Sequence, residues 1–333
     1  MDVGFFFWPF DTALTLRLAG AAEAYGYDMI GVADTPGNAM DPWISATLIA
    51  AHTKRPKVAL CVTNLTSRHP AATAAAIASL DLVSEGRAVL GIGAGNSGTK
   101  NLGVGSSKAD ALKDGVRFIK TLLRGERAEY QGAPAHLPWV KRAPPVFQAG
   151  SLPRSLEAAG AAADGVFSNY GLDAESLRAS AGHVARGASA AGRSPAELEI
   201  WQIACLDCHD ERDVARRKLG AILAFVSGYV IGGGDLAARG VPERIIGPLR
   251  ELRRRYSTRP GDADARMVEE LGLFDYLAGR LAVWGNPQDC LRQAMAAKAA
   301  GATRLMFTVS LAADPVRTVE LFGEKVLPAL KAD

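Results

Sequence analysis

Short runs of β-branched and aromatic residues recur along the 333-residue chain, and each precedes a segment rich in alanine and leucine with helical spacing. The predicted strand and helix pairs are GFFFW (4–8) with 12–25, DMIGVA (28–33) with 41–53, VALCVT (58–63) with 70–84, RAVLGI (87–92) with 107–124, PVFQA (145–149) with 151–162, DGVFS (164–168) with 173–191, LEIWQIACL (198–206) with 210–227, and RLMFTVS (304–310) with 314–330. Strands that are apolar on both faces and joined by helices indicate a parallel sheet covered by helices.

Such a sheet can be an open doubly wound sheet or a closed barrel. A doubly wound dinucleotide fold places its glycine-rich turn after the first strand, with an acidic residue about 20 positions further on. Here the segment GIGAGNSG (91–98) follows the fourth strand, and Asp110 and Asp114 lie inside the next predicted helix. Eight units, a mid-chain glycine turn and an even composition favour a (β/α)8 TIM barrel of the α/β class.

We expect residues 1–333 to form a single domain with two insertions. Residues 126–143, after the fourth helix, are predicted to form a hairpin. Residues 228–286, after the seventh helix, form a longer excursion that contains the basic stretch PLRELRRRY (248–256) as a helix. Insertions at the strand ends of a barrel usually cover the binding cavity, and contacts between subunits are the alternative role for the longer one.

Composition limits the possible partners. The chain has 38 Lys and Arg residues against 35 Asp and Glu residues, and the basic residues are scattered, so no nucleic-acid partner is expected. Without a basic leader or an apolar run of about 18 residues, no membrane association is expected either. Four cysteines are too few for a disulfide framework and predict a reducing compartment, the cytoplasm. The five histidines are dispersed, and no metal site is predicted.

Five segments, taken together and in order, resemble one family of enzymes. They are GYDMIGVAD (26–34), CVTNLTSRHP (61–70), RAVLGIGAGNSG (87–98), QAGSLPRSLEAAGAAADGV (148–166) and LAVWGNPQDC (281–290). The chain is similar to the luciferase-like flavin and deazaflavin oxidoreductases. Its V-T-N-x-x-x-R-H-P segment and its G-x-G-x-G turn resemble the branch that contains the F420-dependent methylenetetrahydromethanopterin reductases.

This resemblance implies a flavin-type cofactor at the carboxyl ends of the strands. Its ring would lie against a bulge in the third strand that contains a non-proline cis peptide, by position Cys61–Val62. The residues expected to bind the cofactor are Cys61, Val62, Thr63, Asn64, Gly93, Ala94, Gly95, Ala149, Gly150, Ser151 and Arg280. Glycines in the fourth-strand turn let backbone amides approach a ring or a phosphate. Amides of Gly150 and Ser151 at a helix start favour an anion, although Ser151 could be a plain helix cap.

The same resemblance places Asp34 and Thr35 beside the ring or the substrate, and Asp34 and Asn96 are the candidate catalytic residues. Sugar-phosphate dehydrogenases of the family have a histidine and a glutamate where this chain has Thr35 and Asn96, so their acid–base pair is absent. Without that pair, reduction of an activated C=C or C=N bond, or an oxygenation, fits better than alcohol oxidation.

The identity of the cofactor decides the class of reaction. The pairing of the two motifs favours coenzyme F420, and hence hydride transfer to a small organic substrate. The alternatives are an FMN-dependent monooxygenase that uses oxygen, and a non-catalytic barrel that has lost cofactor binding. The resemblance also implies a homodimer, and the sequence leaves the substrate open.

Overall fold

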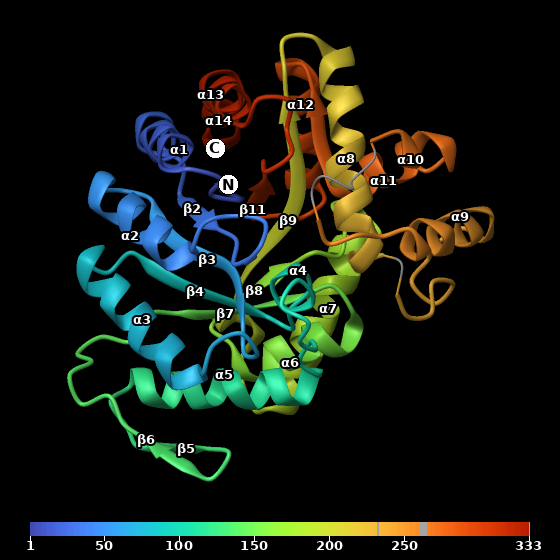
Figure 1. Cartoon of the computed structure of the whole chain (residues 1–333). Helices are drawn as coiled ribbons and strands as arrows, with labels where there is room; N and C mark the ends of the chain where they lie inside the picture. Colours follow the sequence, from blue (N-terminus) through green and yellow to red (C-terminus); the bar gives the residue numbers. More distant parts are fainter. Residues whose placement is uncertain (232, 260–264, 333) are drawn as a thin grey trace.

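The computed structural model describes residues 1–231, 233–259 and 265–332, which form a closed parallel barrel covered by helices (Figure 1). Eight strands follow one another around the barrel in chain order, and the last pairs with the first. These strands are β1 (Asp2–Phe7), β2 (Met29–Val32), β3 (Lys57–Asn64), β4 (Ala88–Gly93), β7 (Val146–Gly150), β8 (Gly165–Ser168), β9 (Glu199–Cys208) and β11 (Arg304–Thr308). The predicted (β/α)8 TIM barrel of the α/β class is confirmed.

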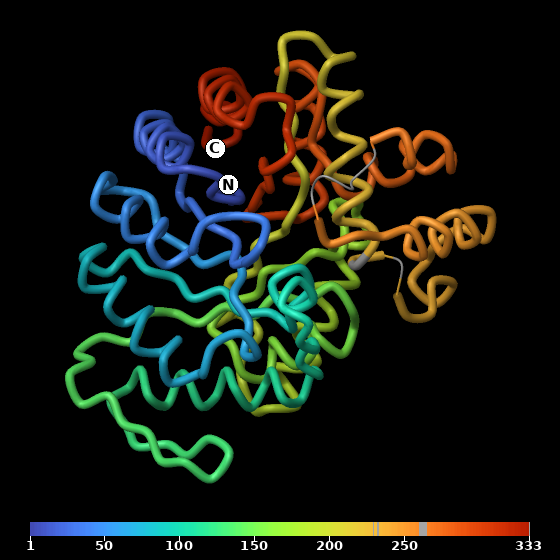
Figure 2. Tube along the Cα trace, viewed as in Figure 1, coloured from blue at the N-terminus to red at the C-terminus, as the bar shows by residue number. Residues whose placement is uncertain are grey.

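Helices cover the outside of the sheet, and one of them follows each barrel strand (Figure 2). They are α1 (Thr12–Tyr25), α2 (Pro42–His52), α3 (Pro70–Val83), α5 (Ala109–Leu123), α6 (Pro153–Ala162), α7 (Ala174–Ala190), α8 (Arg212–Val230) and α13 (Pro315–Lys325). The helix expected over 314–330 is divided, because Pro328 has no N–H to donate and α14 (Leu327–Lys331) begins there as a separate helix. Among the described residues, no helix is both long enough and apolar enough to cross a bilayer.

The longer predicted insertion, 228–286, contains more regular structure than the sequence indicated. Its helices are α9 (Glu243–Arg254), α10 (Ala265–Glu270) and α11 (Phe274–Leu281), and they lie on one side of the barrel (Figure 1). A ninth strand, β10 (Ala282–Gly285), pairs with the carboxyl half of β9 and leads into α12 (Pro287–Ala299). The sequence did not predict β10, because four apolar residues directly after a helix carry no strand signal of their own. Residues 232 and 260–264 of this insertion lie outside the described residues.

The basic helix of this insertion begins earlier than expected. Helix α9 starts at Glu243 rather than at Pro248, which lies inside it. The sequence misled because proline usually marks a helix start. The buried residues Ile245, Leu249 and Leu252 share one face of α9, and their packing offsets the hydrogen bond that Pro248 cannot make.

The shorter insertion forms the predicted hairpin, which extends away from the barrel (Figure 2). Its strands are β5 (Ala128–Tyr130) and β6 (Ala133–Ala135). Gln131 and Gly132 connect them with φ values of 52° and 80°, the left-handed pair that a tight antiparallel hairpin requires. Between β4 and α5 the chain adds a short helix, α4 (Ser97–Lys100), that the sequence did not indicate.

Aromatic side chains fill the barrel interior by occupying space that glycines leave on nearby strands. A Cβ atom at Gly91 would lie 2.2 Å from the Leu60 carbonyl oxygen and 2.7 Å from the Phe167 ring. A Cβ atom at Gly165 would lie 2.5 Å from the Phe147 ring. The two rings pack edge to face with centroids 5.3 Å apart. The barrel interior at the level of these two rings is therefore a packed core.

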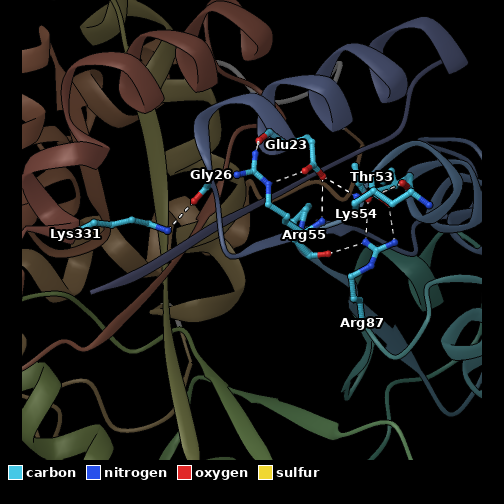
Figure 3. Close-up of polar contacts among 9 residues, drawn as sticks. Glu23, Gly26, Thr53, Lys54, Arg55, Arg87 and Lys331 are labelled. Atoms are coloured by element: carbon cyan, nitrogen blue, oxygen red, sulfur yellow. Dashed lines mark hydrogen bonds and ion pairs between the residues drawn. The ribbon is translucent and has the colours of Figure 1, made fainter.

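At the amino ends of the strands, two charged side chains connect loops that are distant in sequence (Figure 3). Arg87 donates hydrogen bonds of 2.9 Å to the carbonyl oxygens of Ala50, Thr53 and Pro56. Glu23 accepts hydrogen bonds from two backbone N–H groups of the loop before β3, at 2.7 and 3.1 Å. Lys331 donates to the Gly26 carbonyl oxygen at 2.6 Å and fastens the last helix to the same end. This end of the barrel supports stability, as is usual in TIM barrels.

Replacing Gly91 by alanine should destabilise the fold, because the new methyl group would overlap the Leu60 carbonyl oxygen and the Phe167 ring. Overpacking of this kind costs about 1–3 kcal/mol of unfolding free energy. Gly20 in α1 is the matched control, since a Cβ atom there meets no atom within 4 Å and alanine should stabilise the helix by about 0.5–1 kcal/mol. Urea unfolding measures both changes. A Gly91→Ala variant as stable as the wild type would contradict this description of the interior.

Candidate active site

A cavity of about 550 Å³ opens at the carboxyl ends of the barrel strands, and α8 covers one side of it. Its volume is within the range of sites that enclose a small ligand. All the predicted site residues except Arg280 line this cavity: Asp34, Cys61, Val62, Thr63, Asn64, Gly93, Ala94, Gly95, Asn96, Ala149, Gly150 and Ser151. The barrel therefore brings together residues from four predicted strand ends and the turns that follow them at one site.

The end of β3 has the irregularity that the family resemblance implied. The Cys61–Val62 peptide bond is cis, and the register between β3 and β4 shifts between Leu60 and Thr63. The Cys61 side chain is buried, and burial raises the pKa of its thiol, so the group is neutral at physiological pH. A Cβ atom at Gly93 would lie 2.9 Å from Val62 Cγ2, so β3 and β4 are in close contact at the floor of the cavity.

The glycine turn after β4 is shaped by contacts within the protein itself. Gly95 has a φ of 91°, which glycine adopts without strain. A Cβ atom at Gly98 would lie 2.4 Å from the Asp34 carbonyl oxygen, so only glycine allows the turn to approach the loop after β2. This approach places Asp34 and Asn96 in the same cavity wall. Contact between a ligand and the backbone amides of this turn stays a prediction.

The carboxyl group of Asp34 lies at the end of β2 beside the cavity. Burial raises its pKa, and the negative charge of Asp41 adds to this effect. The Thr63 hydroxyl, which donates to Asp34 Oδ2 at 2.6 Å, and the Arg68 guanidinium both oppose the increase. A carboxyl group with a raised pKa in a cavity can hold and release a proton closer to neutral pH than a solvated aspartate can.

Asn96 is held by a residue of the long insertion. Its side-chain Nδ2 donates a hydrogen bond to the Tyr256 hydroxyl, and burial raises the pKa of Tyr256 to about 12, which keeps the phenol neutral. Two residues further on, Thr258 Oγ1 donates to Asn101 Oδ1 at 2.6 Å, and the Thr258 carbonyl oxygen accepts from Asn38 Nδ2 at 2.8 Å. The insertion is thus fastened to the loops after β2 and β4, both of which contribute to the cavity.

Ser151 lies in the turn between β7 and α6, but it is not the residue that caps α6. The capping hydrogen bonds of α6 are made by Ser155, whose Oγ accepts from the Leu152 N–H at 3.1 Å and donates to its carbonyl oxygen at 2.8 Å. The Ser151 hydroxyl is therefore not needed as the helix cap. A Cβ atom at Gly150 would lie 2.9 Å from Leu156 Cδ2, so glycine here permits the packing of α6 against β7.

Two arginines of the insertion contact the loops that follow β7 and β8. Arg280, in α11, is not among the residues that line the cavity; its Nε donates to the Tyr170 carbonyl oxygen at 3.4 Å, and its Nη1 to the Tyr276 hydroxyl at 3.3 Å. Arg239 is buried and was not anticipated from the sequence. It donates hydrogen bonds to the carbonyl oxygens of Ser151, Val230, Ile231 and Gly233. Arg239 thus holds the Ser151 backbone in place.

Three polar residues at strand ends of the cavity were missed in the sequence. Asn169 directly follows β8, Thr308 ends β11 and Ser310 comes two residues later. A polar residue at the carboxyl end of a barrel strand is itself a signal, and it could have identified all three. The Asn169 side-chain oxygen is buried and has no hydrogen-bond partner within the described parts of the chain. A buried acceptor of this kind suits a ligand that carries an N–H or O–H group.

One wall of the cavity is apolar. Phe6 and Trp8 come from β1 and the residues after it, and α8 contributes the side chains Ile222, Phe225 and Val226. The rings of Trp8 and Phe225 meet edge to face with centroids 4.9 Å apart. The contribution of α8 carried no sequence signal, because its buried face is that of any amphipathic helix.

The barrel, the irregular end of β3 and the strand-end cavity define a class of protein. The model of the luciferase-like monooxygenase family matches residues 10–304, and the chain belongs to this family. It is 27% identical to the 5,10-methylenetetrahydromethanopterin reductase of Methanolobus tindarius, over 98% of this chain and 100% of that protein.

Solved structures show the same fold. The coenzyme F420-dependent tetrahydromethanopterin reductase of Methanopyrus kandleri matches with a TM-score of 0.80 and 24% identity over 99% of each chain. The oxygenating constituent of 3,6-diketocamphane monooxygenase from Pseudomonas putida, solved in complex with FMN, matches with a TM-score of 0.65 and 20% identity over 98% of each chain. The fold is therefore common to F420-dependent and FMN-binding relatives.

Replacing Thr63 by valine should raise the pKa of Asp34 further, because the hydroxyl group that stabilises the carboxylate is lost while the shape of the side chain is kept. Thr63→Ser keeps the hydroxyl and is the control. The measurement is an NMR titration of the carboxyl carbons of labelled aspartates, with the Asp34 signal assigned by its loss in Asp34→Asn. The same Asp34 titration in the wild type and the valine variant would contradict the role of this hydrogen bond.

Proposed function

We propose that this protein is an oxidoreductase that binds coenzyme F420 in the strand-end cavity and transfers hydride to a small organic substrate with an activated C=C or C=N bond. The observation that carries the proposal is the convergence of the predicted cofactor residues, Arg280 excepted, on one cavity. The full-length similarity to a methylenetetrahydromethanopterin reductase supports F420 as the cofactor.

The lining of the cavity fits a flat ring with an anionic end. The neutral Cys61 and Val62 offer the ring an uncharged surface at the end of β3. The partnerless amide oxygen of Asn169 can accept a hydrogen bond from an N–H group of the ring. Ser151, just before the first turn of α6, offers a hydroxyl group near the helix N-terminus, where the helix dipole favours a phosphate.

Bound F420 supplies a ring carbon that donates or accepts a hydride. The residues of this chain supply the proton and the orientation. Asp34 Oδ1 is the atom that takes up or releases a proton, because Oδ2 accepts the hydrogen bond from Thr63. Asn96, whose amide nitrogen is held by Tyr256, presents its oxygen to a donor on the substrate. The wall formed by Trp8 and Phe225 excludes water and favours a substrate with an apolar body.

A second candidate function is oxygenation with FMN, which the shared fold with an FMN-bound monooxygenase supports. Fluorescence titration of the purified protein with F420 and with FMN separates the candidates. We expect F420 to bind at least tenfold more tightly than FMN, about 1.4 kcal/mol or more. Preference for FMN would favour the monooxygenase, and binding of neither cofactor would favour the barrel that has lost cofactor binding.

Ser151→Ala should weaken F420 binding by about tenfold to a hundredfold, because one hydrogen bond to a charged group is worth about 1.5–3 kcal/mol. Its melting temperature should stay near that of the wild type, since Ser155 makes the capping hydrogen bonds of α6. Ser155→Ala is the comparison variant and should lower the melting temperature through loss of the cap. Unchanged F420 affinity in Ser151→Ala would remove Ser151 from the proposed phosphate site.

We infer a homodimer that uses the outer layer formed by α2 and α3. These adjacent helices expose Ile44 (59%), Leu82 (61%) and Val83 (49%), large apolar side chains that a partner subunit would cover. Sedimentation velocity should give a dimer for the wild type and a shift toward monomer for Leu82→Asp. A monomeric wild type at micromolar concentration would contradict the inference.

A cytoplasmic location agrees with the state of the cysteines. Cys61, Cys205, Cys208 and Cys290 are all unpaired and buried. Compartments that form disulfides select for paired cysteines, so four free thiols support a reducing compartment.

A further inference from the structure

Tyr256 is a residue of the long insertion that contacts the candidate catalytic residue Asn96. After α9 the chain turns back toward the barrel (Figure 1), and Tyr256 lies two residues beyond the end of that helix. Its hydroxyl oxygen accepts the hydrogen bond from Asn96 Nδ2. Tyr256 therefore belongs to the insertion by its place in the sequence and acts on the strand-end cavity through this contact.

Three contacts hold the ring of Tyr256. The ring packs against that of Phe225 in α8 with centroids 5.8 Å apart. A Cβ atom at Gly228, further along α8, would lie 2.2 Å from Tyr256 Cδ2, so glycine there lets the ring approach the helix. Lys100 Nζ, in α4, lies 5.4 Å from the ring centroid, within the range of a cation–π interaction. The hydroxyl group is thus presented to Asn96 from a fixed position.

The Asn96 side chain does not cap the helix that it precedes. Asn96 is the N-cap residue of α4, and an asparagine in this place normally accepts a hydrogen bond from the first turn with its side-chain oxygen. Within the described chain, Asn96 makes no such capping bond. Its amide nitrogen donates to Tyr256 instead. Because the oxygen is at the other end of the amide, it is left for a ligand in the cavity that Asn96 lines.

We propose that Tyr256 is a positioning residue that holds Asn96 with its amide oxygen facing the cavity, so that the site selects a second reactant with an N–H or O–H group beside its reacting bond. This inference rests on the proposed function, because the second reactant is the molecule that receives the hydride. A reactant with only an acceptor at this place leaves the Asn96 oxygen without a partner. A site built around a hydrogen bond discriminates strongly against such a molecule.

Without the Tyr256 hydroxyl, two other arrangements are open to Asn96. Its oxygen can cap α4, or the amide can rotate and present its nitrogen to the cavity, since the two ends of an amide have nearly the same shape. Either change removes the acceptor from the cavity. The packing of the ring is not part of this role, so Tyr256→Phe, which removes the hydroxyl alone, is the variant that tests it.

Three flat bicyclic molecules of nearly the same shape probe the acceptor. Indole carries an N–H donor, indene carries a CH2 group at the same place, and benzofuran carries an acceptor oxygen. Saturation-transfer NMR measures their dissociation constants with the F420-loaded protein and with the protein alone. We expect the ratio of indole affinity to indene affinity to be about fivefold higher in the wild type than in Tyr256→Phe, the effect of one net hydrogen bond. Comparing the two proteins cancels the difference in hydration between the probes.

The side-chain amide of Asn96 gives a second readout that does not depend on any ligand. Labelling of asparagines with 15N resolves the side-chain NH2 signals, and Asn96→Leu assigns the Asn96 pair by its loss. The proton that donates to Tyr256 should shift upfield in Tyr256→Phe, because the hydrogen bond is lost. Asn96→Leu should also lower the indole-to-indene ratio as much as Tyr256→Phe does, since it removes the acceptor itself.

Thr258→Val is the matched control. It removes another hydroxyl group of the same segment, whose hydrogen bond to Asn101 Oδ1 fastens the insertion without contacting Asn96. This variant should keep the indole-to-indene ratio and the Asn96 signals of the wild type.

The inference is overturned by a ratio that is the same in Tyr256→Phe as in the wild type. It is also overturned by an equal loss in Thr258→Val, since Tyr256 would then only help to fasten the insertion. A wild type that favours benzofuran over indole, compared with Asn96→Leu, would mean that the amide nitrogen faces the cavity. Absence of binding by all three probes overturns the inference too, because the cavity would then admit no flat neutral reactant. All these outcomes leave F420 binding intact, whereas failure of F420 to bind overturns the proposed function.

Discussion

The space that glycines of one strand leave for aromatic rings of nearby strands determines where this barrel is filled by side chains and where it is hollow. Gly91 and Gly165 make room for the rings of Phe167 and Phe147, so the interior is filled up to the level of those rings. At the carboxyl ends of the strands, small or polar residues such as Ala149 and Asn169 line the open space, and the rings of Phe6 and Trp8 lie along its apolar wall. The floor of the cavity is thus the upper layer of the core, and the site depends on the packing beneath it.

The sequence predicted the barrel because eight separate segments repeated the same alternation, so an error in one boundary could not change the fold. It placed Asp34 and Thr63 at the site through the family resemblance, and they lie together there because strand ends of a parallel barrel meet at one face. It missed Phe225 and Tyr256, since the path of the insertion over that face depends on contacts such as that between Thr258 and Asn101, far apart in the chain. It placed Arg280 by analogy, whereas the position of this guanidinium depends on the Tyr170 carbonyl oxygen.

The cavity wall comes from two parts of the chain, the strand ends with their turns and the segments that cover them, and these two parts have different roles. Strand ends and their short turns are fixed by the barrel and offer a constant surface to the cofactor. The segment with Tyr256 belongs to an excursion that the barrel does not require for closure, and the Tyr256 ring packs against Phe225 of the barrel helix α8 with centroids 5.8 Å apart. Changes in that excursion can alter the apolar wall through this contact while the proposed cofactor site is kept. On this view, the substrate range of a barrel of this kind is decided by its longest insertion.

The guanidinium of Arg239 contacts both parts at once. It donates to carbonyl oxygens at the end of α8 and, at 3.2 Å, to that of Ser151 beside α6. The position of the insertion and the shape of the proposed phosphate site are therefore coupled through Arg239. A ligand that distinguished two positions of this turn would bias the position of the insertion by the same coupling free energy, because linkage between two sites is reciprocal.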